Sequence, residues 1–416
     1  MGARAVALAA LALVACERTS AKYCELHGLS DPQSCGYMDA PLDTPKACSL
    51  DTECAPGRCN TMSMQCVQCL SGSDCSPASP FCDPQTFTCG ACRTNADCTE
   101  SLACLAEGQC AASSDVIYVD SANGSDTAAC TKEAPCKTIT HALTKLNTSH
   151  TTIKLSGAFN EAVVFKTQTA TILADPGTTL TSTGGTAIAF MMMGSNVQVY
   201  DLEIMGTKNS AAVVAGGNKL SLNRVKIHDC GMIAVTNAGQ LTVSRSKIYS
   251  NPAGGLGLTG SFDVTNSVIV HNGGDGTAFG GVSITGAGQS TFEFNTVADN
   301  DAKGGGANVG GVLCTTSGFQ APNNIIARNT SMGDASAANA NVAANTPCDF
   351  TGTTIQTDVA GLAFVDPDNT PFDYHIGSAS TAKDTAGVLS LISQDFDSQA
   401  RPYGPGKDRG ADEYHP

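Results

Sequence analysis

Hydrophobic and polar residues alternate in short runs that recur between residues 220 and 300. Three of these runs begin at Leu220, Leu241 and Phe262, 21 residues apart, and looser copies begin at Phe292 and Phe319. Alternation over so few residues is typical of a strand with one buried face. A period in the low twenties, rich in β-branched residues, indicates a solenoid in which each strand pairs with its copy in the next coil, about 4.8 Å away.

The same alternation predicts which side chains point into the coil. A leucine-rich repeat is the alternative fold, but no stretch within a repeat has helical periodicity. We therefore favour a parallel β-helix, an all-β fold. The expected inward residues are Leu220, Leu222, Ile227, Leu241, Val243, Ile248, Phe262, Val264 and Ile269.

An asparagine ends each copy of the repeat, at Asn251, Asn272, Asn300 and Asn329. Asparagine tolerates the left-handed backbone that a sharp corner needs. Its amide can also bond the asparagine of the next coil. We expect a ladder of asparagine side chains along one corner.

Residues 48–110 have few apolar residues and many cysteines. Each of three blocks opens with two cysteines separated by five residues, and Glu53, Asp74 or Asp97 precedes the second of them. Repeats of about 22 residues with so little apolar content cannot build a core, so disulfides must hold them. We expect two bridges per block in an unknown connectivity, with zinc at the two CxxC junctions as the alternative. The cysteines are Cys48, Cys54, Cys59, Cys66, Cys69, Cys75, Cys82, Cys89, Cys92, Cys98, Cys104 and Cys110.

The first residues have the pattern of an export signal. Arg4 precedes a short apolar run over residues 5–15, which is too short to span a bilayer. The residues LVAC, ending at Cys16, resemble a bacterial lipobox, which implies a lipid on Cys16. An ordinary cleaved signal peptide with an incidental cysteine is the alternative. We expect residues 1–16 to be the signal, and residues 17–47, with Cys24 and Cys35, to be a linker.

The segments that flank the repeats carry a family resemblance. The run IYVDSANGSD at 117–126, then Pro135 and the run CKTITHAL at 136–143, resembles the entry of secreted bacterial right-handed parallel β-helix proteins of the pectate-lyase-like superfold. The runs at 372–387, 395–401 and 409–414 resemble their closing segment. The resemblance implies a right-handed parallel β-helix solenoid over residues 115–350 and a C-terminal segment over residues 351–416 that caps the last coil.

The resemblance also implies details at the entry and at the N-terminus. A small amphipathic helix would plug the first coil with Ile139, Ala142, Leu143 and Leu146, and a bridge between Cys130 and Cys136 would staple it. The cysteine blocks resemble the repeats that act as stalks or interaction modules in secreted bacterial proteins. The chain is therefore expected to place a small disulfide-rich domain before the solenoid.

Three further cysteines have separate expectations. Cys314 falls on an inward position, so it is either a small core residue or the partner of Cys348. Cys230 stands where other coils have asparagine, and we expect it to be buried and unpaired.

The charge balance limits the class of partner. Asp and Glu number 38 and Lys and Arg number 23, which gives a formal net charge of -15. Binding the phosphate backbone needs a basic field, so nucleic acid is excluded as the main partner. The acidic excess is compatible with divalent cations.

Two carboxylates form the first candidate site. Asp263 and Glu293 both lie between inward residues, and we expect them to stack about 5 Å apart in adjacent coils. Stacked carboxylates share a proton or bind a cation such as Ca²⁺, and such a spacing suits a retaining glycosidase. Two solvated acids on an exposed strand are the alternative.

A basic column forms the second candidate site. Arginine offers forked donors to a carboxylate or sulfate, and tyrosine offers a face to a sugar ring. The alternative is an exposed strand whose cations keep the edge soluble. The candidate ligand-binding residues are Arg224, Lys226, His228, Arg245, Lys247 and Tyr249.

Motifs of known β-helix enzymes are missing. The paired Asp-Asp of polygalacturonases, the Arg-x-Pro-x-x-Arg of pectate lyases and a Gly-x-Ser-x-Gly elbow are absent. We therefore expect a monomeric outer-membrane lipoprotein, facing outward, whose β-helix binds an extracellular glycan or envelope protein without catalysis, cofactor or resident metal. The alternative is a polysaccharide lyase or glycoside hydrolase that uses Asp263 and Glu293, with the basic column as a subsite and Ca²⁺ as its one candidate cofactor.

Overall fold

The computed structural model describes residues 47–184, 189–286, 288–304 and 308–416. Cys16, Cys24 and Cys35 lie outside this range, so the expected lipobox and linker stay predictions. The chain divides into two compact units. The first comprises the residues up to Arg93 together with Ala106–Gln109, and the second comprises Thr94–Leu105 together with Cys110–Pro416. Among the described residues, no helix has the length and apolar content needed to cross a membrane.

Disulfides hold the cysteine blocks, as predicted. In the first two blocks the first cysteine bonds the third and the second bonds the fourth, and Cys98–Cys110 repeats the second of these bridges in the third block. Cys92 and Cys104 are also disulfide-bonded, which excludes zinc at the CxxC junctions. The bridges of the first two blocks are Cys48–Cys59, Cys54–Cys66, Cys69–Cys82 and Cys75–Cys89.

Each block has little regular structure apart from one 3-10 turn, and the first two also form a hairpin. The turns are η1 (Asp51–Glu53), η2 (Gly72–Asp74) and η3 (Asn95–Asp97), and a further turn, η4 (Ser113–Asp115), leads into the solenoid. The antiparallel hairpins pair β1 (Arg58–Asn60) with β2 (Gln65–Val67), and β3 (Phe81–Cys82) with β4 (Cys89–Gly90).

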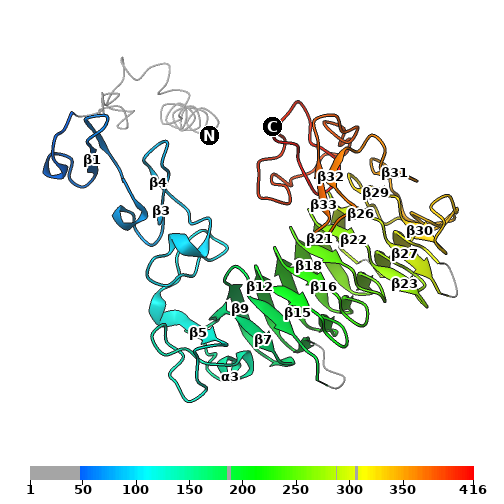
Figure 1. The fold of residues 1–416 in the computed structure, drawn as a ribbon, viewed down its shortest axis with the longest axis horizontal. Coiled ribbons are helices and arrows are strands. Elements are labelled where there is room, and N and C mark those ends of the chain that lie inside the picture. The colour runs from blue at the N-terminus through cyan, green and yellow to red at the C-terminus, as the bar shows by residue number, and fades with distance from the viewer. Residues whose placement is uncertain (1–46, 185–188, 287, 305–307) are drawn as a thin grey trace, which may run out of the picture. The chain divides into compact units, whose positions relative to one another are not determined.

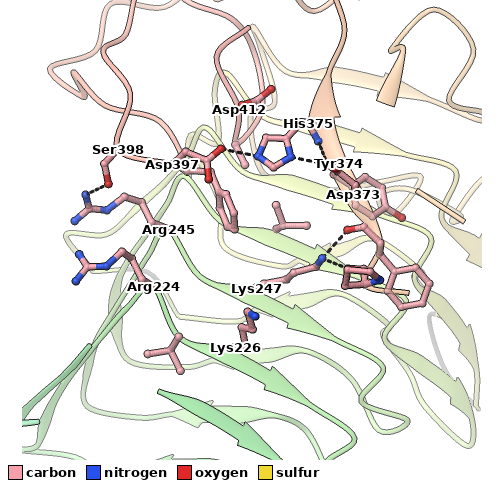
Figure 2. Close-up of a pocket in the computed structure, with 16 residues that line it drawn as sticks. Arg224, Lys226, Arg245, Lys247, Asp373, Tyr374, His375, Asp397, Ser398 and Asp412 are labelled. Carbon is pink, nitrogen blue, oxygen red and sulfur yellow. Dashed lines mark hydrogen bonds and ion pairs between the residues drawn. The ribbon is translucent and has the colours of Figure 1, made fainter. Parts of the chain in front are cut away.

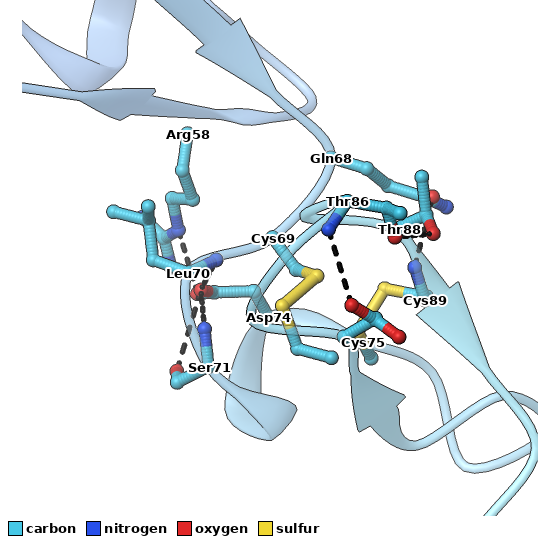
Figure 3. Close-up of a disulfide and its surroundings, with 12 residues drawn as sticks. Arg58, Gln68, Cys69, Leu70, Ser71, Asp74, Cys75, Thr86, Thr88 and Cys89 are labelled. Atoms are coloured by element: carbon cyan, nitrogen blue, oxygen red, sulfur yellow. Dashed lines mark hydrogen bonds and ion pairs between the residues drawn. A yellow bond between two sulfur atoms is a disulfide. The ribbon is translucent and has the colours of Figure 1, made fainter. Parts of the chain in front are cut away.

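The acidic residue before each second cysteine caps the turn of its block. Asp74 accepts hydrogen bonds from the backbone amides of Leu70 (3.0 Å) and Ser71 (3.1 Å), and Figure 3 shows its carboxylate between them and Arg58. These bonds, led by that from the Leu70 amide, lower the pKa of Asp74. Glu53 and Asp97 cap their own turns in the same way. The recurring acid is therefore structural.

The first long sheet of the second unit carries the repeat seen in the sequence. Its strands all pair in parallel, and Leu220, Leu241 and Phe262 lie in one register column. All nine predicted inward residues are buried in one core. The strands are β5 (Val116–Asp120), β6 (Thr152–Ser156), β9 (Thr169–Ala174), β12 (Asn196–Tyr200), β15 (Lys219–Asn223), β18 (Gln240–Ser244), β21 (Ser261–Thr265) and β25 (Thr291–Glu293).

A second parallel sheet follows the corner after each of these strands from β6 onward. Figure 1 shows its strands stacked beside those of the first sheet along the solenoid. The strands are β7 (Ala158–Asn160), β10 (Thr179–Thr181), β13 (Glu203–Met205), β16 (Lys226–His228), β19 (Lys247–Tyr249), β22 (Val268–Val270), β26 (Thr296–Ala298), β29 (Ile325–Ala327) and β31 (Thr354–Gln356).

A third parallel sheet closes the coil, and a small sheet extends its last turns. The third sheet contains β8 (Val163–Lys166), β11 (Phe190–Met193), β14 (Ala212–Val214), β17 (Val235–Asn237), β20 (Leu256–Leu258), β24 (Val282–Ile284) and β28 (Val312–Cys314). The small sheet contains β23 (Gly273–Asp275), β27 (Asp301–Lys303) and β30 (Thr330–Ser331).

The expected asparagine ladder follows the second sheet. Asn251 Nδ2 donates to Asn272 Oδ1 at 2.8 Å, Asn272 to Asn300 at 3.0 Å, and Asn300 to Asn329 at 2.9 Å. The left-handed backbone lies one residue earlier than predicted, at Ser250, His271, Asp299 and Arg328. The asparagines themselves are fully buried and bind main-chain carbonyls of the preceding coil, such as Ile248 O.

The entry helix and the remaining cysteines agree with expectation. Helix α3 (Ile139–Leu143) buries Ile139, Ala142 and Leu143, and Leu146 packs against the same core. Disulfides join Cys130 to Cys136 and Cys314 to Cys348. Cys230 is buried and unpaired, and its amide donates to Asn251 in the ladder.

The C-terminal segment packs along the outer face of the second sheet. The hairpin of β32 (Phe364–Asp366) and β33 (Asp373–Ile376) places Tyr374 in a cluster with Tyr249, Val268 and Val270. Strands β22, β26 and β29 are consequently buried on both faces, which explains their near-continuous apolar sequences. The segment therefore covers the outer face of several coils, because an apolar outer face must itself be covered.

Candidate functional site

Asp263 and Glu293 do not stack. Asp263 pairs with Thr291, whereas Glu293 pairs with Thr265, two residues farther along the strands. The prediction aligned Phe262 with Phe292, but the coil is longer here, and Phe292 lies beside Val264. Glu293 accepts a hydrogen bond from Asn323 at 2.9 Å. The expected glycosidase pair and Ca²⁺ stack therefore lose their geometric basis.

The basic residues do lie together on neighbouring coils. Lys226 pairs with Lys247 in register, and Arg224 and Arg245 occupy equivalent left-handed corners, each two residues before its strand, β16 or β19. His228 pairs with Tyr249, and their rings stack with centroids 4.5 Å apart. The basic column is therefore continuous, as its sequence spacing predicted.

A pocket of about 420 Å³ separates this basic column from the C-terminal segment. Figure 2 shows Arg224, Lys226, Arg245 and Lys247 on the β-sheet side, opposite His375 and its neighbouring carboxylates. Apolar side chains complete the wall. The lining residues are Arg224, Val225, Lys226, Arg245, Lys247, Val268, Pro371, Phe372, Asp373, Tyr374, His375, Phe396, Asp397, Ser398, Ala411 and Asp412.

The four cations differ in how far their charge is compensated. Asp201 neutralises Arg224 through two hydrogen bonds of 2.6 and 2.8 Å. Arg245 donates instead to neutral oxygens, including Ser398 Oγ at 2.8 Å and Asn223 Oδ1 at 3.0 Å. Within the described part of the chain, no carboxylate forms an ion pair with Lys226, Arg245 or Lys247. The pocket therefore has an excess of positive charge on its sheet side.

Lys247 is the most perturbed of these cations. Its ammonium donates to the carbonyl oxygens of Pro371 and Phe372, so it holds the C-terminal segment against the sheet. Burial lowers the pKa of Lys247 to about 8, because desolvation disfavours the ammonium form. Lys247 therefore titrates close to physiological pH.

The opposite wall carries a histidine between carboxylates. His375 Nδ1 lies 2.5 Å from Asp373 Oδ1, and Nε2 lies 2.6 Å from Asp397 Oδ2. The hydrogen bond with Asp397 is the main cause that raises the pKa of His375 to about 9. Asp412 is buried beside them, and desolvation raises its pKa to about 7.

His228 and Tyr249 do not line the pocket. Both are almost fully buried, and His228 is held between Glu203 (2.9 Å) and Asp229 (2.7 Å). Phe372 packs edge-on against Tyr249 with ring centroids 6.0 Å apart. These two predicted ligand residues thus stabilise the docking of the C-terminal segment.

A comparison with family models agrees with this fold. Residues 147–330 match the model of the right-handed β helix region. The chain is a right-handed parallel β-helix protein. No curated protein matches its sequence.

Two solved structures are similar to this β-helix protein. Pectate lyase Pel9A shares 12% identity and a TM-score of 0.41, covering 72% of this chain and 96% of that one. A rhamnogalacturonan lyase shares 9% identity and a TM-score of 0.32, covering 67% of this chain and 97% of that one. Likenesses of this size carry no argument about the site, so its chemistry rests on its own residues.

Sequence reasoning did not find the second wall of the pocket in this β-helix protein. Asp373, His375, Asp397 and Asp412 lie in segments that were read only as a cap. The spacing between His375 and Asp397 is 22 residues and follows no repeat. A histidine close to several aspartates is the one sequence signal that could have found it.

Proposed function

We propose that the protein binds an acidic polysaccharide in the pocket between its basic column and its C-terminal segment, without cleaving it. The supporting observation is that Lys226, Arg245 and Lys247 meet in a concave site without an ion-pair partner among the described residues, on a chain with a net charge of -15. Carboxylate or sulfate groups would satisfy these donors, and Phe372 and Phe396 offer apolar surface to a sugar ring.

The expected location agrees with such a ligand. Stable disulfides belong to oxidising compartments, and both the cysteine blocks and the solenoid contain them. We propose that the chain is exported and anchored at the cell envelope by a lipid on Cys16. An extracellular glycan, or an envelope protein that presents acidic groups, then lies within reach.

A pair of lysine variants tests the binding site. Lys226 lines the pocket, whereas Lys219 is exposed on β15 outside it. Lys226→Gln should weaken binding to acidic polysaccharides about tenfold, and Lys219→Gln should leave it within twofold. Binding should also weaken with added salt and be absent for neutral polysaccharides. Equal binding by both variants, or equal binding to neutral chains, would refute the proposal.

One observation favours the alternative, a polysaccharide lyase. A lysine whose pKa is about 8 is a candidate base for abstracting a proton beside a uronate carboxylate, and Lys247 lines the pocket. Incubation with acidic polysaccharides, with and without Ca²⁺, tests this alternative. Release of unsaturated products that Lys247→Gln abolishes would establish catalysis, and Asp263→Asn should have no effect on it.

A further inference from the structure

Three potential metal ligands converge on the C-terminal wall of the pocket. One ligand atom each of His375, Asp397 and Asp412 lies within 4.8 Å of the other two. All three residues line the pocket, and Figure 2 shows the imidazole of His375 with Asp397 and Asp412 on one side of it. Imidazole nitrogen and carboxylate oxygen together suit a transition metal better than Ca²⁺ or Mg²⁺, which prefer oxygen alone.

The orientation of His375 is fixed by a fourth side chain. Asp373 holds Nδ1 at 2.5 Å, which turns Nε2 toward Asp397 and Asp412. A carboxylate on the far nitrogen is the usual outer partner of a metal-bound histidine. His228 has the same pair of carboxylate neighbours, but no third carboxylate among the described residues completes a ligand set there.

Asp412 supplies an independent reason to expect a cation. Its side chain is only 6% exposed, and the described chain gives it one hydrogen bond, from the Ile376 amide at 2.8 Å. A carboxylate has room for about four such partners, and a buried one that lacks them is costly. A cation bound beside Asp412 would supply such a partner.

We propose that His375 Nε2, Asp397 and Asp412 form a Zn²⁺ site, with Asp373 as a positioning residue. The metal replaces the proton shared by His375 Nε2 and Asp397, and that proton leaves to solvent. Zinc ligands lie about 2.0–2.2 Å from the metal and about 3.4 Å from one another in a tetrahedral site, so His375 Nε2 and Asp397 Oδ2, now 2.6 Å apart, must separate by about 1 Å to admit the metal. Asp397 can do so, because its side chain is 42% exposed.

Three protein ligands leave a fourth zinc position, on the side of the pocket. Water fills that position in sites of this kind, and a carboxylate or sulfate of a ligand can replace it. This last step rests on the proposed function. The metal would then hold one end of an acidic group whose other oxygens face Lys226 and Arg245.

Metal titrations of the full exported chain test the site. After removal of metal with a chelator, Co²⁺ should produce the visible absorption of tetrahedral coordination at one equivalent, and Zn²⁺ should displace it. His375→Gln and Asp397→Asn should abolish this signal, and Asp373→Asn should weaken metal binding about 10- to 100-fold. His150→Gln, a control at a histidine that does not line the pocket, should leave it unchanged. Far-ultraviolet circular dichroism confirms the fold, and the exposed position of Asp397 protects that variant from misfolding.

Several results would overturn the assignment. The first is that the protein binds no metal at micromolar Zn²⁺. The second is that His375→Gln and Asp397→Asn both bind the metal as tightly as the parent protein. The third is that Ca²⁺ binds as tightly as Zn²⁺. Polysaccharide binding is measured separately, with and without chelator. Absence of the Co²⁺ signal in the parent protein refutes the zinc site alone, whereas absence of polysaccharide binding by the zinc-loaded parent protein refutes the proposed function.

Discussion

Arg245 Nη1 donates a hydrogen bond of 2.8 Å to Oγ of Ser398, a residue 153 positions later in the chain. The bond joins a corner of the β-helix to the C-terminal segment, and both residues line the pocket. Lys247 joins the same two parts through the carbonyls of Pro371 and Phe372. The pocket therefore exists only when the C-terminal segment is docked, and two of its cations, Arg245 and Lys247, hold that segment in place.

Arg245 and Arg224 form a natural pair of test sites, because they occupy equivalent left-handed corners of adjacent coils. Arg224 is neutralised by Asp201, whereas Arg245 binds only neutral oxygens. Arg245→Gln should weaken acidic-polysaccharide binding about tenfold, since a charge-assisted contact is lost. Arg224→Gln should change it less than threefold. Calorimetric titration measures both, and a larger loss for Arg224→Gln would contradict this division of roles.

The asparagine ladder should carry a measurable share of the stability. Asn272→Ala removes the acceptor of the Asn251 backbone amide, one of the acceptors of the Asn251 side chain, and the side-chain donor to the carbonyl of Ile248, all in a fully buried corner. We expect a loss of about 3 kcal/mol in the free energy of unfolding. Equilibrium denaturation measures it. Asn196→Ala, at an exposed position of β12, should cost less than about 0.5 kcal/mol. Equal costs would show that the ladder contributes nothing beyond its packing.

The sequence predicted the solenoid well where the coil length is constant. Leu220, Leu241 and Phe262 are 21 residues apart, and they lie in one register column because an identical coil returns each strand to the same place. The prediction failed at Glu293, where the coil lengthens and the pair of aromatic residues offered two alignments. Only the hydrogen-bond register, which places Phe292 beside Val264, decides between them.

Of the two walls of the candidate site, only the basic column could be predicted from the sequence. The basic column follows the repeat, so its residues could be aligned by eye. His375, Asp397 and Asp412 belong to a segment without period, and their approach to Lys247 depends on where that segment folds back. The near-continuous apolar residues of β22 indicate that the outer face of this strand is covered, but they do not indicate which part of the chain covers it.

The bridge between Cys314 and Cys348 should stabilise the late coils. It closes a loop of 34 residues, for which chain entropy gives about 4 kcal/mol. The double variant Cys314→Ala/Cys348→Ala should therefore lose about 2–4 kcal/mol in chemical denaturation. Cys230→Ala, which removes a buried but unpaired thiol, should lose about 1 kcal/mol. If the double variant is as stable as Cys230→Ala, the covalent bond contributes no stability beyond the packing of its two sulfur atoms.

Lys247 should make both binding and stability depend on pH, with opposite signs. Burial lowers its pKa from 10.5 to about 8, so the ammonium that attracts an anionic ligand is lost between pH 7 and pH 9. Affinity for an acidic polysaccharide should fall about tenfold over that range, which corresponds to about 1.4 kcal/mol. The Lys247→Arg variant should keep its affinity, because arginine stays protonated throughout.

The free energy of unfolding should rise with pH, whereas the affinity falls. The folded protein releases the Lys247 proton more readily than the unfolded chain, so between pH 8 and pH 10 the unfolded state binds more protons and the free energy of unfolding rises with pH. In Lys247→Gln this rise should disappear, since a neutral side chain carries no desolvation cost that pH can relieve. Denaturation curves at pH 7, 8.5 and 10 measure the difference between the parent and the variant. A parent protein whose affinity and stability both fall with pH would show that another group, and not Lys247, controls the pocket.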